Sequence, residues 1–180
     1  MTSSELITEF INTRHIHGSR EDEDMLTSPD VLGAWLAAQG LLPAGGRVSA
    51  TDLTRALAVR EALRTLLLAN NEVEVDLAPA SAVLDEAAQR AGVELRFADG
   101  ATALAPSAAG VEGALGQILA AVHETRADGS WSRLKACRAR DCEWAFVDLA
   151  KNQSRAWCSM RSCGNREKAR LFRERQRSGA

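Results

Sequence analysis

The sequence predicts an α+β fold, with a mainly α-helical N-terminal body that contains one β-hairpin and a small C-terminal module built around cysteines. Three observations predict this fold. Apolar residues recur at helical spacing through most of the first 129 residues, one short segment after Gly92 alternates apolar and polar residues, and all four cysteines lie within residues 137–163. We therefore expect two units, the body at residues 1–129 and the module at residues 130–180.

Five helices are expected in the body, at about residues 6–11, 29–40, 50–70, 80–91 and 110–128. The second follows the capping residue Ser28, and Gly92 ends the fourth. Residues 93–97 then alternate apolar and polar side chains, and after a turn at residues 98–100 the chain returns through residues 102–104. This alternation predicts the β-hairpin of the body.

The four cysteines form two pairs of equal spacing, Cys137 with Cys142 and Cys158 with Cys163. Two short-spaced pairs joined by a longer segment can supply four thiolates to one tetrahedral ion, the coordination that Zn²⁺ takes in structural sites. Two disulfides would need an oxidising compartment, and iron–sulfur sites usually have closer or less symmetric cysteine spacing. The sequence therefore predicts a Zn²⁺ site with these four ligands.

The first ten residues lack the basic leader and apolar run of a signal peptide, and no stretch is long enough to span a membrane. We therefore expect a cytoplasmic protein without a membrane partner. We also find no nucleophile elbow, phosphate-binding loop, zinc-protease motif or paired-carboxylate pattern. Zinc with four cysteine ligands has no open position for a water, so the chain is expected not to be an enzyme.

The net charge of −2 hides an asymmetry between the two units. The body has 9 Lys and Arg against 19 Asp and Glu, whereas the module has 13 against 5. A module with a net charge of +8 repels itself, and the phosphate backbone of a nucleic acid relieves that repulsion. We expect the module rather than the body to meet a polyanion; simple solvation of the basic side chains is the alternative.

Within the module, residues 143–149 roughly alternate large apolar with polar or small side chains, residues 151–154 have turn chemistry, and residues 155–157 lead back to the metal. This pattern predicts a hairpin between the two cysteine pairs. From residue 165 to residue 178 good helix formers follow without interruption by Pro or Gly, which predicts a terminal helix. Knuckle, hairpin and helix, with the last cysteines at the helix entrance, make a treble-clef-like plan.

Four arginines of the terminal helix lie within about 60° of one another around its axis: Arg166, Arg170, Arg173 and Arg177. Lys168 lies on the other side, and Ala169 and Phe172 are expected to face the hairpin. Guanidinium groups on one helix face suit phosphate contacts and bidentate recognition of guanine. We expect the four arginines and Lys168 to contact DNA; RNA, a protein partner, solvent or the acidic body are the alternatives.

The stretch from Trp157 to Arg166, together with the earlier Cys137 and Cys142 pair, resembles the CGNR zinc finger. The body resembles the ABATE domain, which usually precedes that finger, through residues 10–14, 26–29, 35–36 and 60–64. The two resemblances cover nearly the whole chain. They imply a stress-induced bacterial transcription regulator with a DNA-binding finger, whose zinc ligands are the four cysteines. Residues 151–155 are less basic than the same turn of related fingers often is.

Two sets of polar residues each allow a functional and a structural interpretation. Asn165 and Arg166 follow the last cysteine, where an amide can bond a thiolate sulfur or cap the helix and a guanidinium can reach a phosphate or the body. Ordinary helix-entry chemistry is the alternative. Residues 12–14 and Arg60 are polar groups in apolar helical surroundings, where Asn12, Arg14 and Arg60 can line an anion or ligand pocket that signals to the finger. A buried capping network is the alternative.

These observations support three hypotheses. The first is a zinc-dependent, DNA-binding regulator whose body senses a small ligand or mediates a homodimer. The second is a redox or metal sensor, in which oxidation of the thiolates releases zinc and unfolds the module. The third is a protein-interaction adaptor that docks through the basic terminal helix.

Overall fold

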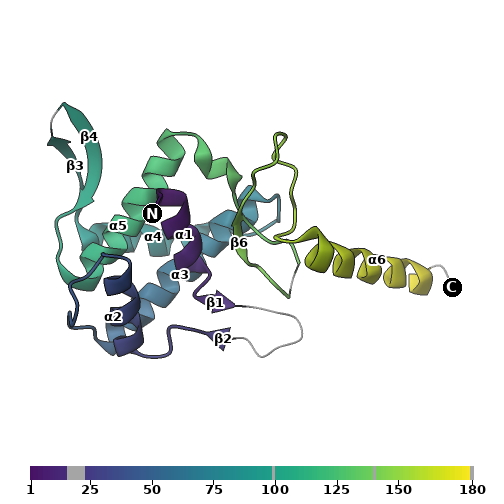
Figure 1. Cartoon of the computed structure of the whole chain (residues 1–180), viewed down its shortest axis with the longest axis horizontal. Coiled ribbons are helices and arrows are strands. Elements are labelled where there is room, and N and C mark those ends of the chain that lie inside the picture. Colours follow the sequence, from purple (N-terminus) through teal and green to yellow (C-terminus); the bar gives the residue numbers. More distant parts are fainter. Residues whose placement is uncertain (16–22, 99, 140, 179–180) are drawn as a thin grey trace.

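The computed structural model describes residues 1–15, 23–98, 100–139 and 141–178. The helical body lies at one end of the molecule and the C-terminal helix projects from the other (Figure 1). The polar stretch at residues 15–24, which from its composition is expected to be a loop, and the predicted turn at residues 98–100 lie partly outside the described residues. In the described ranges no helix is long and apolar enough to cross a membrane.

The five helices predicted for the body are present. They are α1 (Ser3–Ile11), α2 (Pro29–Ala38), α3 (Ala50–Asn70), α4 (Ala78–Ala91) and α5 (Gly110–Ala127). Side-chain oxygens of Thr2, Ser28 and Ser49 accept backbone N–H bonds at the starts of α1, α2 and α3, which explains why these helices begin there. Gly92 takes the left-handed conformation that ends α4, as the sequence predicts.

Three antiparallel two-stranded sheets accompany the helices. The predicted hairpin is β3 (Val93–Ala98) with β4 (Ala101–Pro106), and a short pair not predicted joins β1 (Arg14–His15) to β2 (Glu23–Asp24). The third sheet pairs β5 (Leu134–Ala136) with β6 (Ala145–Val147), with Leu134 opposite Val147. It follows a turn of 3-10 helix, η1 (Ser130–Arg133), that continues from α5.

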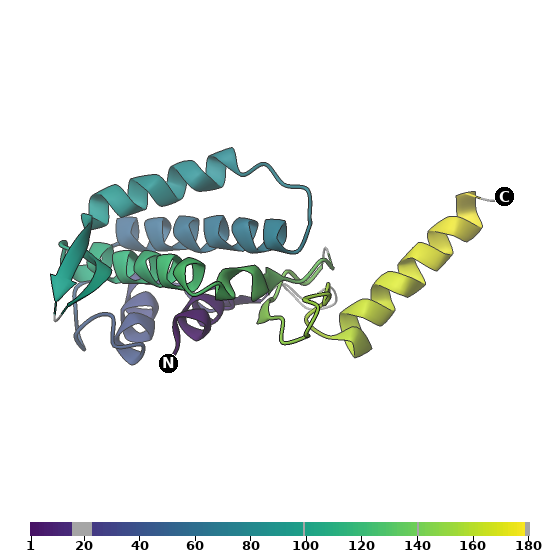
Figure 2. The same cartoon turned by 90° about the horizontal axis from the view of Figure 1, so that it is seen from above.

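One apolar core spans both units. The long helix α3 packs against α1, α4 and α5, and α5 lies beside α1, as the view from above makes clear (Figure 2). Trp131 and Leu134 are buried in the same core cluster as Phe10 of α1 and Leu67 of α3. Trp131 and Leu134 therefore dock the module on the body.

The hairpin of the module lies elsewhere than predicted. Its first strand, β5, precedes Cys137, so the hairpin encloses the first cysteine pair instead of lying between the two pairs. Burial explains the difference, because Leu134 and Ala136 are fully enclosed by the shared core and a strand there hides both. The segment predicted as the returning strand is not a strand; the carbonyl of Ala156 accepts a hydrogen bond from the backbone N–H of Arg138.

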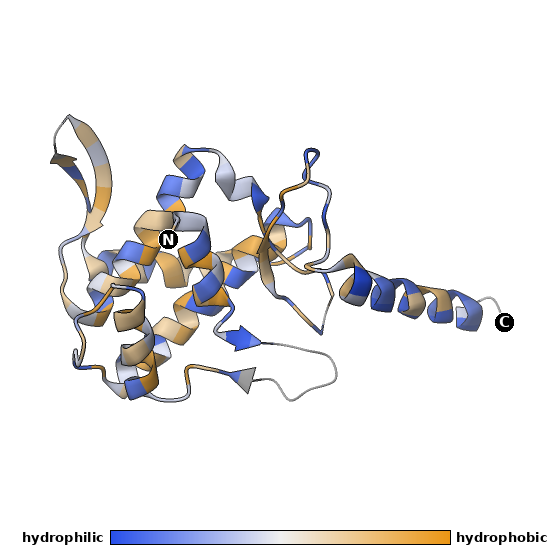
Figure 3. Cartoon of the chain, in the orientation of Figure 1, coloured by the Kyte–Doolittle hydropathy of each residue, from blue (hydrophilic) through white to orange (hydrophobic). Residues whose placement is uncertain are grey.

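The terminal helix, α6 (Asn165–Ser178), is present as predicted but does not pack on the hairpin. None of its described side chains is buried, and Phe172 is 63% exposed. The expectation that Ala169 and Phe172 face the hairpin is therefore wrong. Figure 3 shows α6 as a mostly hydrophilic helix that extends away from the remainder of the chain.

Candidate metal centre and basic helix

The four cysteines come together from the two places that the sequence predicts. Cys137 follows β5 directly, and Cys142 lies in the turn that leads into β6. Cys158 and Cys163 flank the start of η2 (Met160–Gly164), a π-helical turn that runs into α6. The hairpin thus holds one pair, and the entrance of the terminal helix holds the other.

The sulfur atoms of these cysteines have the spacing of a tetrahedral site. All four lie within 4.8 Å of one another, and the Sγ atoms of Cys142 and Cys163 are each 3.6 Å from the Sγ atom of Cys158. Four sulfurs at zinc–sulfur distances of about 2.3 Å around one tetrahedral ion stand about 3.8 Å apart. All four thiols are free, so the disulfide alternative does not describe this structure. The residues present fit Zn²⁺.

The protonation of the thiols also favours a cation among them. Hydrogen bonds from the thiols of Cys142 and Cys158 lower the pKa of Cys137, whereas the same interactions raise the pKa of Cys142 and Cys158. In other words, one thiolate is stabilised by its neighbours and further thiolates are opposed by crowding. A divalent ion removes that opposition, because it attracts every thiolate at once.

Arg166 reaches the metal centre, whereas Asn165 does not. The Nη2 atom of Arg166 lies 3.5 Å from the Sγ atom of Cys163 and 3.1 Å from a carboxylate oxygen of Asp141. Although partial burial alone would lower it, the hydrogen bond with Asp141 and the nearby thiol groups raise the pKa of Arg166. The amide of Asn165 instead donates to the backbone carbonyl of Arg161, which is helix-entry chemistry. The role of both residues around the metal stays a prediction.

The arginines of α6 differ in how far they are engaged. Arg170 bridges Glu167 and Glu174 at 2.8 and 2.6 Å, and these bonds raise its pKa. The Nε atom of Arg173 donates to the carbonyl of Ala169, one turn earlier. Within the described chain, Arg177 and Lys168 make no hydrogen bond or ion pair. Arg170 and Arg173 are therefore held by contacts within α6, whereas Arg177 and Lys168 are not held by the described residues.

Side chains of the body hold the backbone of the finger around the cysteines. Asn12 both donates to the carbonyl and accepts from the N–H of Ala145, the first residue of β6. Arg64, only 2% exposed, donates to the carbonyl of Glu143 and to the carbonyl of Ile11 at 2.8 Å each. A buried arginine thus ties the residue after Cys142 to the end of α1.

A second set of contacts lies at the end of α3. The amide of Asn71 donates to the carbonyls of Ala136 and Ala156, and that of Asn70 donates to the carbonyls of Trp131 and Leu134. The residue after Ala136 is the first cysteine, so body side chains fix the chain on its approach to the metal. These contacts of Arg64, Asn70 and Asn71 were not predicted. The sequence does contain one signal for the two asparagines, because they form a polar pair at the end of a long apolar helix.

The residues predicted to line a ligand pocket have other contacts in this structure. Arg60 makes a bidentate ion pair with Asp24 at 2.8 and 2.7 Å and donates to the hydroxyl of Thr13. Burial alone would raise the pKa of Asp24, but bonds from Arg60 and from the N–H of Leu26 hold it below its ordinary value. Arg14 lies 3.6 Å from Glu61. A ligand pocket formed by Asn12, Arg14 and Arg60 stays a prediction.

The comparisons with known proteins agree with this arrangement. A family described as "Putative stress-induced transcription regulator", the ABATE domain, matches residues 4–129, and the CGNR zinc finger matches residues 133–176. No curated protein matches the chain. The description of the ABATE family is thus that of a transcription regulator. The chain therefore belongs to the ABATE family, and its four clustered cysteines are the Zn²⁺ site of a CGNR zinc finger.

Proposed function

We propose that the protein is a cytoplasmic transcription regulator that binds DNA through α6, with zinc holding that helix in position. One observation carries the proposal: α6 is a 14-residue helix with no buried side chain among those described, and six of its residues are Lys or Arg against two Glu. A helix with such a surface gains nothing from the protein core, so its sequence is best explained by a partner outside the chain. The charge favours a polyanion.

The dimensions of α6 suit the major groove of DNA. Fourteen residues make a helix about 21 Å long, and the major groove is about 12 Å wide and admits one helix. Arg173 and Arg177 lie on the part of α6 farthest from the metal, and both are exposed with respect to the described residues. We assign phosphate or base contacts to these two residues, with Arg170 and Lys168 beside them. Arg166, held at the metal centre, positions the helix.

The test is DNA binding by the full zinc-loaded chain at several salt concentrations, measured by fluorescence anisotropy. We expect affinity to fall steeply with salt and expect the double variant Arg173→Ala with Arg177→Ala to lower the slope of log K against log salt by about two. Arg96→Ala, which removes an exposed arginine from β3, is the matched control and should leave binding unchanged. The proposal would be rejected if DNA affinity did not change with salt concentration, or if the double variant and the control lost the same DNA affinity. Immunoprecipitation with sequencing then identifies the bound sequence.

A second function, redox sensing, is favoured by the exposure of one cysteine. Cys158 is partly exposed and, with Cys142 and Trp144, lines a cavity of about 280 Å³ beside the metal centre. A hydroperoxide entering there can transfer its terminal oxygen to the Cys158 thiolate and, on taking up a proton, leave as an alcohol. The thiolate of Cys142, 3.6 Å away, can then attack the sulfenic sulfur, which forms a disulfide and releases hydroxide.

The same DNA titration tests this second function. After dilute hydroperoxide treatment, the sensing hypothesis expects zinc release and loss of DNA binding, with recovery when a dithiol and zinc are added. Unchanged zinc content after treatment contradicts redox sensing but leaves the DNA-binding proposal intact. Capture of one dominant protein partner by α6, without DNA binding, would favour the adaptor hypothesis.

A further inference from the structure

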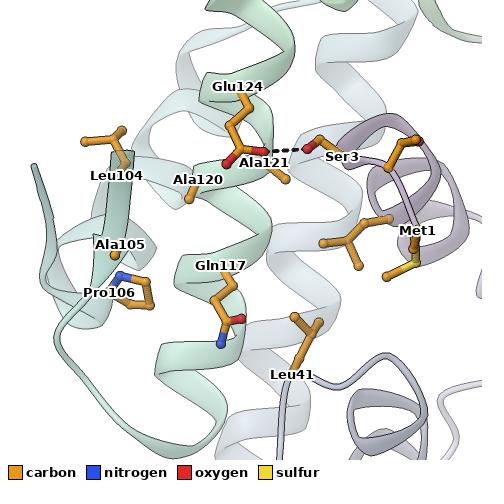
Figure 4. Close-up of a pocket in the computed structure, with 12 residues that line it drawn as sticks. Met1, Ser3, Leu41, Leu104, Ala105, Pro106, Gln117, Ala120, Ala121 and Glu124 are labelled. Carbon is orange, nitrogen blue, oxygen red and sulfur yellow. Dashed lines mark hydrogen bonds between the residues drawn. The ribbon is translucent and has the colours of Figure 1, made fainter. Parts of the chain in front are cut away.

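The body has a cavity that is separate from both the metal centre and the predicted ligand residues. It has a volume of about 460 Å³ and lies between the start of α1, the middle of α5, the end of β4 and Leu41 (Figure 4). This volume is within the range of roughly 300 to 1,000 Å³ that is typical of small-molecule sites. Apolar walls come from α1, β4 and the segment after α2, among them Leu6, Leu41, Leu104 and Pro106.

Polar groups gather on one side of this cavity. Ser3 donates to one carboxylate oxygen of Glu124 at 2.5 Å, and the other oxygen has no hydrogen-bond partner in the described chain (Figure 4). Gln117 projects from α5 between Pro106 and Leu41. Among the described lining residues, the exposed Glu124 has the only charged side chain, so a carboxylate or phosphate ligand would meet its negative charge. A cationic group can instead pair with the carboxylate of Glu124.

We propose that this cavity binds a small organic amine, with its apolar part against Leu6, Leu41 and Leu104 and its ammonium group on Glu124. The ammonium competes with the hydroxyl of Ser3 for the carboxylate, because a charge-assisted hydrogen bond is stronger than a neutral one. The acidic body attracts such a cation over a longer range, since residues 1–129 have 19 acidic against 9 Lys and Arg residues.

The position of the cavity connects it to the finger. Ser3 is the first residue of α1, and Asn12 just after the other end of α1 bonds both backbone groups of Ala145. Glu124 lies one turn before the end of α5, where Arg126 stacks on the Trp131 ring at 4.6 Å and the chain continues into β5. Both helices that meet at the cavity therefore end at the hairpin that encloses Cys137 and Cys142. Loss of the Ser3–Glu124 hydrogen bond changes how α1 contacts α5, and the ends of both helices transmit this change to the hairpin.

The experiment uses the full zinc-loaded chain, labelled with ¹⁵N, and three probes that differ in charge: naphthylmethylamine, naphthylmethanol and naphthylacetate. We expect the amine to bind at least roughly tenfold more tightly than the acetate, with amide shifts at Ser3, Gln117 and Glu124 and a smaller shift at Ala145. Glu124→Gln should weaken amine binding by roughly tenfold, and Gln117→Trp should fill the cavity and abolish it. Asp85→Asn, which removes an exposed acid from α4, is the charge-matched control.

Each contrary outcome is distinct. Equal affinity for naphthylacetate, or equal losses in Glu124→Gln and Asp85→Asn, overturns the assignment of the cavity to amines. Tight amine binding without a shift at Ala145 overturns the connection to the finger. No DNA is present in these measurements, so they test amine binding independently of the proposed DNA binding.

Discussion

The two halves of the zinc finger are built in opposite ways. The β5–β6 hairpin is embedded in the core of the body, and Leu134, Ala136 and Ala145 are each at most 2% exposed. Helix α6, on the other side of the same four cysteines, has no buried side chain among its described residues. The metal centre is thus the junction between a half that belongs to the body and a half that faces solvent.

Different interactions hold the two halves of the finger in position. The hairpin is fixed by apolar burial and by body side chains such as Asn12, Arg64 and Asn71, which bond backbone groups next to the cysteines. Among the described residues, helix α6 is held through the turn η2 that leads out of the metal centre and through the ion pair of Arg166 with Asp141, which lies between β5 and β6. Any change in the body can therefore move the helix only by way of the hairpin and the cysteines.

The largest effect should follow from loss of a metal ligand on the helix side. Structural zinc contributes roughly 10 to 16 kcal/mol in small finger peptides, so Cys163→Ser should release the metal and unfold the residues after Ala156, including α6. The hairpin and body should stay folded because the core encloses them. Circular dichroism should show the loss of about one helix, and limited proteolysis should cut only after β6.

The control for this variant is Ser154→Ala, which changes an exposed residue of the same module and should keep zinc and α6. If the entire chain of Cys163→Ser unfolded cooperatively, the stability of the hairpin would depend on the metal as much as that of α6 does. This result would contradict the view that the hairpin belongs to the body.

A smaller but global effect should follow from Arg64→Met. The substitution keeps the volume of a buried side chain but leaves the carbonyls of Ile11 and Glu143 without their donor and removes the ion pair with Glu61. We expect the free energy of unfolding to fall by about 3 kcal/mol, measured by urea denaturation of the zinc-loaded protein. Arg55→Met is the matched control on the same helix, because Arg55 is 37% exposed and its pair with Glu112 contributes about 1 kcal/mol or less. Equal losses in the two variants would contradict a special role for Arg64.

Local chemistry in the sequence was enough to predict some of these features. The spacing of the four cysteines specifies the metal site because ligand geometry is set within short turns, and the starts of α2 and α3 follow from their capping residues Ser28 and Ser49. Pairing of β5 with β6 could not be predicted in the same way. It depends on burial against helices from a distant part of the chain, and Asn71 bonds carbonyls 65 and 85 positions away. The buried role of Arg64 escaped prediction for the same reason, since its acceptors lie on other elements, whereas a buried polar network around Arg60 was one of the two expected arrangements.

The smallest effect on stability should be Glu174→Gln, and its effect on binding should have the opposite sign. Arg170 is held along α6 by Glu167 and Glu174, and ion pairs between solvent-exposed groups of this kind contribute little to stability. Because α6 contributes no buried side chain, the melting temperature of the chain should not change measurably. DNA affinity should increase, since the substitution removes one negative charge and frees one side of the Arg170 guanidinium for phosphate. Glu86→Gln, which frees Arg90 on the body, should leave DNA affinity unchanged. A decrease in affinity for Glu174→Gln would show that the ion pairs hold Arg170 in its binding geometry instead of competing with DNA, and the solvent-facing half of the finger would then be more preorganised than its lack of packing suggests.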